Sequence, residues 1–96
     1  MSLKTVALRV RLNEINFLKG IKSYKETYDE IINKLINECD HVVSKVNDSM
    51  GDPLQIYTVK MSNKTKARLY FIAKQIKTSR SEVLRRLIKA KAEGLC

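Results

Sequence analysis

Apolar and polar residues alternate with a period of two in two short segments of the chain, residues 5–12 and 57–61. The apolar rows are Val6, Leu8, Val10 and Leu12 in the first segment and Tyr57, Val59 and Met61 in the second. Alternation of this kind is typical of a half-buried β-strand. We therefore predict two strands, each with one face in the core and one face in solvent.

After the first strand, the apolar spacing changes to that of helices. Residues 14–24 place an apolar side chain about once per turn, and Asn13 can cap them. A second helix should begin after Thr27, because Thr27 and Glu30 have the spacing of a capping box, in which each side chain bonds the backbone N–H of the other. Its broad apolar face continues to residue 46, where we expect it to end.

The second half of the chain repeats this order of strand, helix, turn and capped helix. Ser62 precedes a predicted helix over residues 63–77. Ser79 precedes the last helix, with Glu82 three residues later as in the first half.

Turn-forming residues separate the halves, since Asn, Asp, Ser, Gly and Pro cluster over residues 47–53. Neither half is long enough to bury a core alone. We therefore predict two copies, 1–46 and 55–96, joined by a linker at 47–54. The predicted fold is mainly α with a short two-stranded antiparallel ribbon, in the order β-α-α-β-α-α. The strands can pair within one chain, as a single-chain pseudo-dimer, or between two chains that exchange copies.

Charge divides unevenly between the halves. The 96 residues carry a net charge of +9, with eight Lys/Arg against seven Asp/Glu in residues 1–50 and eleven against three in 51–96. Such an excess indicates a polyanionic partner, here double-stranded DNA, although a solvated lysine-rich surface has the same composition. No apolar run approaches the ~20 residues of a membrane span, and the N-terminus lacks a secretory signal.

The residues that usually carry catalysis or bind metals form no pattern. Cys39 and Cys96 have no partners at metal-ligand spacing, and we expect them to form no disulfide framework. His41 lies near Cys39 but points elsewhere on a helix. There is no Gly-rich phosphate loop, Ser-His-Asp set or carboxylate pair. We therefore expect no catalytic residues, no metal, no cofactor and no membrane, and a cytoplasmic location.

The outward rows of the two strands carry polar and basic side chains. They are Ala7, Arg9, Arg11, Ile56, Thr58 and Lys60. The DNA major groove admits a two-stranded ribbon, where Arg and Lys can bond guanine and Thr can bond a base or contact a thymine methyl group. We predict base contacts from all six. The other basic side chains should be solvated, namely Lys64, Lys66, Arg68, Arg85, Arg86, Lys89 and Lys91.

This arrangement resembles the ribbon-helix-helix (MetJ/Arc-type) DNA-binding family. The two strands, residues 79–84 and, less clearly, residues 27–32 carry the resemblance. Tandem copies in one chain are similar to transcription regulators of archaeal viruses. The resemblance implies that helix N-termini hold DNA phosphates. The matching positions are Thr27, Tyr28, Ser79, Arg80 and Ser81.

The sequence thus predicts a sequence-specific DNA-binding transcription regulator such as a repressor, able to self-associate or assemble cooperatively on DNA. One alternative is a helix-turn-helix in residues 67–89 with residues 80–89 as the recognition helix. Another is an interaction protein of the antitoxin type.

Overall fold

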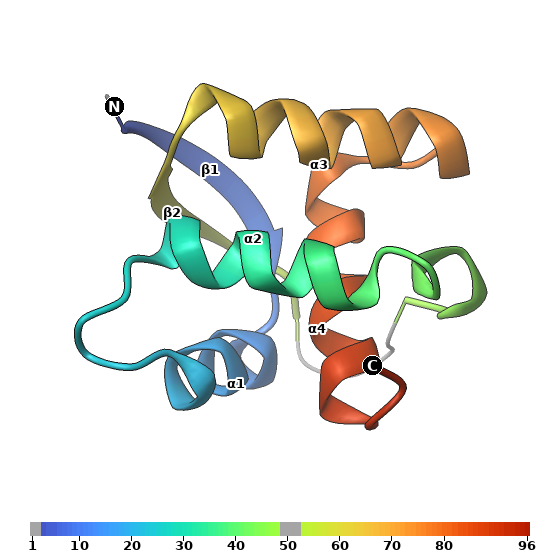
Figure 1. Cartoon of the computed structure of the whole chain (residues 1–96), viewed down its shortest axis with the longest axis horizontal. Coiled ribbons are helices and arrows are strands. Elements are labelled where there is room, and N and C mark those ends of the chain that lie inside the picture. The colour runs from blue at the N-terminus through green and yellow to red at the C-terminus, as the bar shows by residue number, and fades with distance from the viewer. Residues whose placement is uncertain (1–2, 49–52) are drawn as a thin grey trace.

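The computed structural model describes residues 3–48 and 53–96 (Figure 1). Its elements are β1 (Lys4–Val10), α1 (Leu12–Ile21), α2 (Tyr28–Cys39), the 3-10 helix η1 (Val43–Lys45), β2 (Gln55–Met61), α3 (Asn63–Ile76) and α4 (Arg80–Ala92). β1 and β2 pair antiparallel into one sheet, with Ala7 opposite Thr58. The helices pack on one face of this sheet, and the other face is open to solvent.

The prediction of a tandem ribbon-helix-helix repeat, β-α-α-β-α-α, is wrong. The chain folds as a single domain in the order β-α-α-η-β-α-α, with one sheet and one continuous core. The two halves do not form separate copies, because their strands share one two-stranded sheet and the helices of both halves bury one core. Part of the predicted linker, residues 49–52, lies outside the described residues.

The core is built mainly from α2, α4 and the inner row of the sheet. Its least exposed large side chains are Ile32, Leu35, Ile36, Met61, Leu69, Val83, Leu84, Leu87 and Ile88. Full burial of an aliphatic side chain stabilises a protein by about 1.5–3 kcal/mol. Helix α4 lies at the centre of this core, because it packs against β1 and against all three other α-helices.

Two helix boundaries differ from the sequence predictions. Helix α1 begins at Leu12 with Arg11 as its N-cap, since the Glu14 carboxylate accepts the Arg11 backbone N–H at 2.7 Å. Asn13 is therefore inside the helix. Helix α2 ends at Cys39 rather than near residue 46, and η1 continues the apolar row by burying Val43.

A left-handed residue joins α3 to α4. Lys77 has φ 59° and ψ 50°, and the Thr78 N–H closes the turn on the Ala73 carbonyl oxygen at 2.9 Å. This conformation costs a non-glycine residue about 1–2 kcal/mol. The turn is nevertheless fixed, because Ser79 starts α4 immediately afterwards.

A disulfide joins Cys39, the last residue of α2, to Cys96, which follows α4. The expectation that these cysteines form no disulfide framework is therefore wrong. They lie 57 residues apart in sequence, and the fold brings their Cα atoms to 5.3 Å. Cys39 is fully buried, so the bridge forms part of the core.

Replacing Cys96 by Ser should lower the free energy of unfolding. Closing a loop of this size, with the cysteines 57 residues apart, restricts the unfolded chain and contributes about 4 kcal/mol. Chemical denaturation with and without a thiol reductant measures the effect. The reductant should lower the stability of the wild type to that of the variant and leave the variant unchanged. If the oxidised wild type and the variant are equally stable, the bridge does not have the role assigned to it.

Candidate nucleic-acid interface

The outer face of the sheet presents three cross-strand pairs to solvent. They are Thr5 with Lys60, Ala7 with Thr58, and Arg9 with Ile56. Residues directly opposite on antiparallel strands share a face, so these side chains form one patch. Ile56 is 70% exposed, which is unusual for an isoleucine and shows that no described element of this chain covers the patch.

Arg11 does not belong to this face, so its predicted base contact is wrong. It is only 8% exposed, and its Nη1 lies 3.0 Å from an Asp48 oxygen and 3.3 Å from a Glu14 oxygen. The hydrogen bond to Asp48 raises the Arg11 pKa. β1 ends at Val10, so Arg11 leaves the strand to cap α1. Thr5, which the sequence analysis omitted, lies on the outer face instead.

The N-terminus of α4 lies beside this patch and offers free hydrogen-bond donors. Ser79 Oγ accepts the Glu82 N–H at 3.1 Å, but the Glu82 carboxylate pairs with Arg86 at 2.5 Å. The capping box is therefore half formed. Among the described residues no acceptor bonds the backbone N–H groups of Ser79, Arg80 or Ser81. Free N–H groups and the helix dipole favour an anion at such a terminus.

The N-terminus of α2 is less suited to an anion. Glu30 accepts the Thr27 N–H at 2.9 Å, so the capping box is complete. Asp29 and Glu30 place two carboxylates in the first turn. Glu26 lies just outside it, and its hydrogen bond with Lys34 lowers its pKa to about 2. These negative charges oppose a phosphate.

Two surface cavities connect the outer face of the sheet to these helix ends. One, of about 470 Å³, is lined by Ala7, Leu8, Arg9, Leu54, Ile56, Ser79, Ser81 and Arg85. The other, of about 370 Å³, is lined by Leu3, Lys22, Glu26, Thr27, Tyr28, Thr58, Val59 and Lys60. Each predicted base-contacting or phosphate-contacting residue, except Arg11 and Arg80, therefore lines one of these two cavities. One cavity lies beside the N-terminus of α4 and the other beside the N-terminus of α2.

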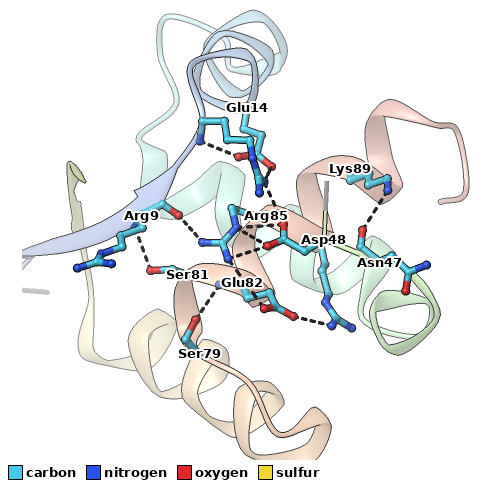
Figure 2. Close-up of polar contacts among 11 residues, drawn as sticks. Arg9, Glu14, Asn47, Asp48, Ser79, Ser81, Glu82, Arg85 and Lys89 are labelled. Atoms are coloured by element: carbon cyan, nitrogen blue, oxygen red, sulfur yellow. Dashed lines mark hydrogen bonds and ion pairs between the residues drawn. The ribbon is translucent and has the colours of Figure 1, made fainter. Parts of the chain in front are cut away.

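Helix α4 also holds the backbone of Arg9 (Figure 2). The Arg9 N–H donates to Ser81 Oγ at 2.9 Å, and Arg85 Nη1 donates to the Arg9 carbonyl oxygen at 2.7 Å. Arg85 was expected to be solvated, but it is 6% exposed. Its buried guanidinium also pairs with Asp48, whose Oδ2 lies 2.9 Å from Nη2. Ser81 Oγ therefore acts as an acceptor within the protein, while its O–H and its backbone N–H can both still donate to a phosphate.

Asp48 connects Arg85 to Arg11 and thereby α4 to the start of α1. Partial burial of the carboxylate favours its neutral form, but hydrogen bonds from Arg85 and Arg11 outweigh this and lower its pKa to about 2. Asp48 is therefore ionised at neutral pH. A sequence pattern could not reveal this group, because Asp48 lies 37 residues from each arginine.

Within residues 3–48 and 53–96 no group of three His, Cys, Asp or Glu side chains could hold a metal ion. None of the described helices combines the length and apolar character needed to cross a membrane.

Comparisons with known proteins found one informative relative. The chain is 44% identical over 96 residues, the full length of both chains, to "Uncharacterized protein 29" of Sulfolobus islandicus filamentous virus (isolate Iceland/Hveragerdi). No protein-family model matches the chain. No solved structure matches it either.

Replacing Asp48 by Asn should destabilise the protein near neutral pH and change how its stability depends on acid. A carboxylate whose pKa falls from 3.8 to about 2 on folding contributes about 2 kcal/mol above its unfolded pKa, and this contribution is lost as pH falls from about 4 through 2. Urea denaturation across this range measures both effects. Asp40→Asn, at an exposed carboxylate, is the control; equal losses in both variants at pH 7 would contradict the assigned role of Asp48.

Proposed function

The chain belongs to the family of the Hveragerdi virus protein, and we propose that it is a transcription regulator that binds double-stranded DNA with sequence specificity. The outer face of the β1–β2 sheet enters the major groove. The observation that carries this proposal is the exposed patch of three cross-strand pairs beside a helix end with free N–H donors.

The side chains of the patch match the chemistry of base edges. Arg9 can bond the O6 and N7 atoms of guanine, and Lys60 can reach the same atoms. Thr58 can donate to or accept from a base, while Ile56 offers an apolar surface for a thymine methyl group. Direct base contacts of this kind supply sequence specificity, which phosphate contacts do not.

Phosphate contacts come mainly from the N-terminus of α4. The N–H groups of Ser79, Arg80 and Ser81 and the Arg80 guanidinium all favour a phosphate there. Thr27 and Tyr28 at the α2 terminus contribute less, because Glu26, Asp29 and Glu30 surround them. The net charge of +9 attracts DNA in general.

Burial of α4 disfavours the alternative helix-turn-helix mode. Val83, Leu84, Arg85, Leu87, Ile88 and Ala90 are all buried. A recognition helix must expose its side chains to base edges in the groove. Helix α4 cannot do this without leaving the core.

The viral relative suggests where the protein acts. As a viral regulator it would work in the cytoplasm of the infected host cell, where viral DNA is transcribed.

Replacing Arg9 by Ala should reduce discrimination between DNA sequences. A bidentate arginine–guanine contact contributes about 1–3 kcal/mol of discrimination. Lys60→Ala should have a smaller effect at a different base pair, because a lysine ammonium makes no bidentate contact. The wild type first selects its binding sites from a random duplex pool. Each variant is then titrated against the selected sites, and anisotropy measures its binding.

The control for these variants is Lys74→Ala, which removes one charge from the last turn of α3. It should weaken specific and non-specific binding equally and only slightly. If Arg9→Ala and Lys60→Ala behave like this control, the sheet does not read bases. If the pool yields no preferred sequence, the proposed function is wrong.

Replacing Arg80 by Ala should weaken binding to all duplexes alike. A plot of the logarithm of the association constant against the logarithm of salt concentration has a slope of about −0.9 per neutralised phosphate. Since this variant loses one phosphate contact, its slope should be less steep by about 1. Titrations at several salt concentrations measure it. An unchanged slope would contradict a phosphate contact at Arg80.

A further inference from the structure

The two strands of the sheet are held differently by the helices behind them. Both backbone polar groups of Arg9 bond side chains of α4, the N–H to Ser81 at 2.9 Å and the carbonyl oxygen to Arg85 at 2.7 Å. Among the described residues no side chain bonds the backbone of Ile56, Thr58 or Lys60, the outward residues of β2. Only one strand of the patch is therefore fixed by side chains.

Helix α2 makes the corresponding contacts to another part of the fold. Asp29 occupies the same place after its N-cap as Ser81, but its carboxylate accepts the N–H of Ser62 at 2.8 Å. Asn33 donates to Thr65 Oγ1 at 2.6 Å. Both bonds attach α2 to the start of α3, beyond the end of β2. The difference between the strands thus follows from the side chains at equivalent helix positions.

Arg85 is well placed to fix a backbone position. It is 6% exposed, and Asp48 accepts hydrogen bonds from both its Nε and Nη2, so its guanidinium plane is held from one side. The remaining nitrogen, Nη1, points to the Arg9 carbonyl oxygen (Figure 2). A planar guanidinium held by a bidentate carboxylate presents its other donor in a fixed direction.

We propose that Ser81 and Arg85 are positioning residues that hold Arg9 in register for base reading, so that the Arg9–Ile56 end of the sheet sets sequence specificity. This inference rests on the proposed DNA-binding function. Neither residue needs to touch a base. Ser81 and Arg85 fix the Cα position of Arg9 relative to the N-terminus of α4, the proposed phosphate site. This matters because a recognition group must lie within about 0.5 Å of its productive position to be effective.

The opposite end of the sheet has a different role under this proposal. Lys60 and Thr5 lie there, and a lysine ammonium is a flexible, strongly hydrated point charge. It tolerates several base or phosphate positions. The base pairs under this end should therefore be read less strictly than those under Arg9.

The first experiment needs no DNA. In the free protein, Ser81→Ala should accelerate hydrogen exchange of the Arg9 amide at least tenfold, because its acceptor is lost. Ser81→Thr keeps the hydroxyl and should retain slow exchange. Unchanged exchange in Ser81→Ala would show that Ser81 does not hold Arg9 and would overturn the proposal whatever the protein binds.

The second experiment measures base discrimination. The base pair read by Arg9 is first identified with Arg9→Ala. Ser81→Ala and Arg85→Lys should each lower discrimination at that base pair about tenfold. Discrimination at the base pair read by Lys60 should stay unchanged. Ser81→Thr should restore the wild-type value. In Ser81→Ala/Arg9→Ala the two losses should not add, since both act through one contact.

A remote core variant separates positioning from general destabilisation. Ile36→Val removes a buried methylene from α2 and should leave discrimination at both base pairs unchanged. Equal losses at both ends of the sheet, or additive losses with Arg9→Ala, would overturn the positioning role. Absence of any base preference in the wild type would instead overturn the DNA-binding function on which it rests.

Discussion

The pairing of β1 with β2 is the constraint on which the rest of the structure depends. Each strand has one apolar row, and neither can satisfy its backbone or bury that row without the other. Since the strands lie about fifty residues apart, their pairing forces the intervening helices to return to the same face. The helices then share one core around α4. The outer row of the sheet is left with no covering layer, which is why polar and basic side chains can gather there.

A sheet of only two strands also leaves an outer edge on each strand, and this chain treats the two edges differently. On β1, side chains of α4 replace a third strand at Arg9. That arrangement requires a buried guanidinium, and a buried charge is tolerable only when it is paired. Asp48 provides the pair and also stabilises Arg11 at the start of α1. Asp48, together with Glu14 at Arg11, thus allows two arginines to lie inside a protein with a net charge of +9.

Local patterns in the sequence were sufficient to predict the positions of the strands and the starts of α2, α3 and α4. Period-two alternation over residues 5–12 and 57–61 overlaps the observed strands Lys4–Val10 and Gln55–Met61, and Thr27, Ser62 and Ser79 each cap a helix. The domain organisation was predicted wrongly, because similar local patterns in both halves indicated two copies of one unit, whereas the elements of both halves pack around α4. The burial of Arg11 and Arg85 and the disulfide were not predicted, because local patterns do not show contacts between residues that are distant in sequence. Arg11, Arg85 and Cys39 are defined by partners 37 or 57 residues away. In the candidate site, the outward row was predicted except at Arg11, where a strand residue became a helix cap.

The disulfide between Cys39 and Cys96 has a consequence for shape as well as stability. It ties the C-terminal end of α2 to the segment after α4, whereas the N-terminal ends of these two helices flank the sheet. Because α2 and α4 also pack against each other, the bridge limits how far their C-terminal ends can move apart. If the proposed DNA binding uses both N-terminal ends, the packing of the two helices sets the distance between the phosphates that they contact. DNA whose phosphate spacing differs from that distance would then have to deform, and the elastic cost would discriminate between sequences at positions that no side chain touches.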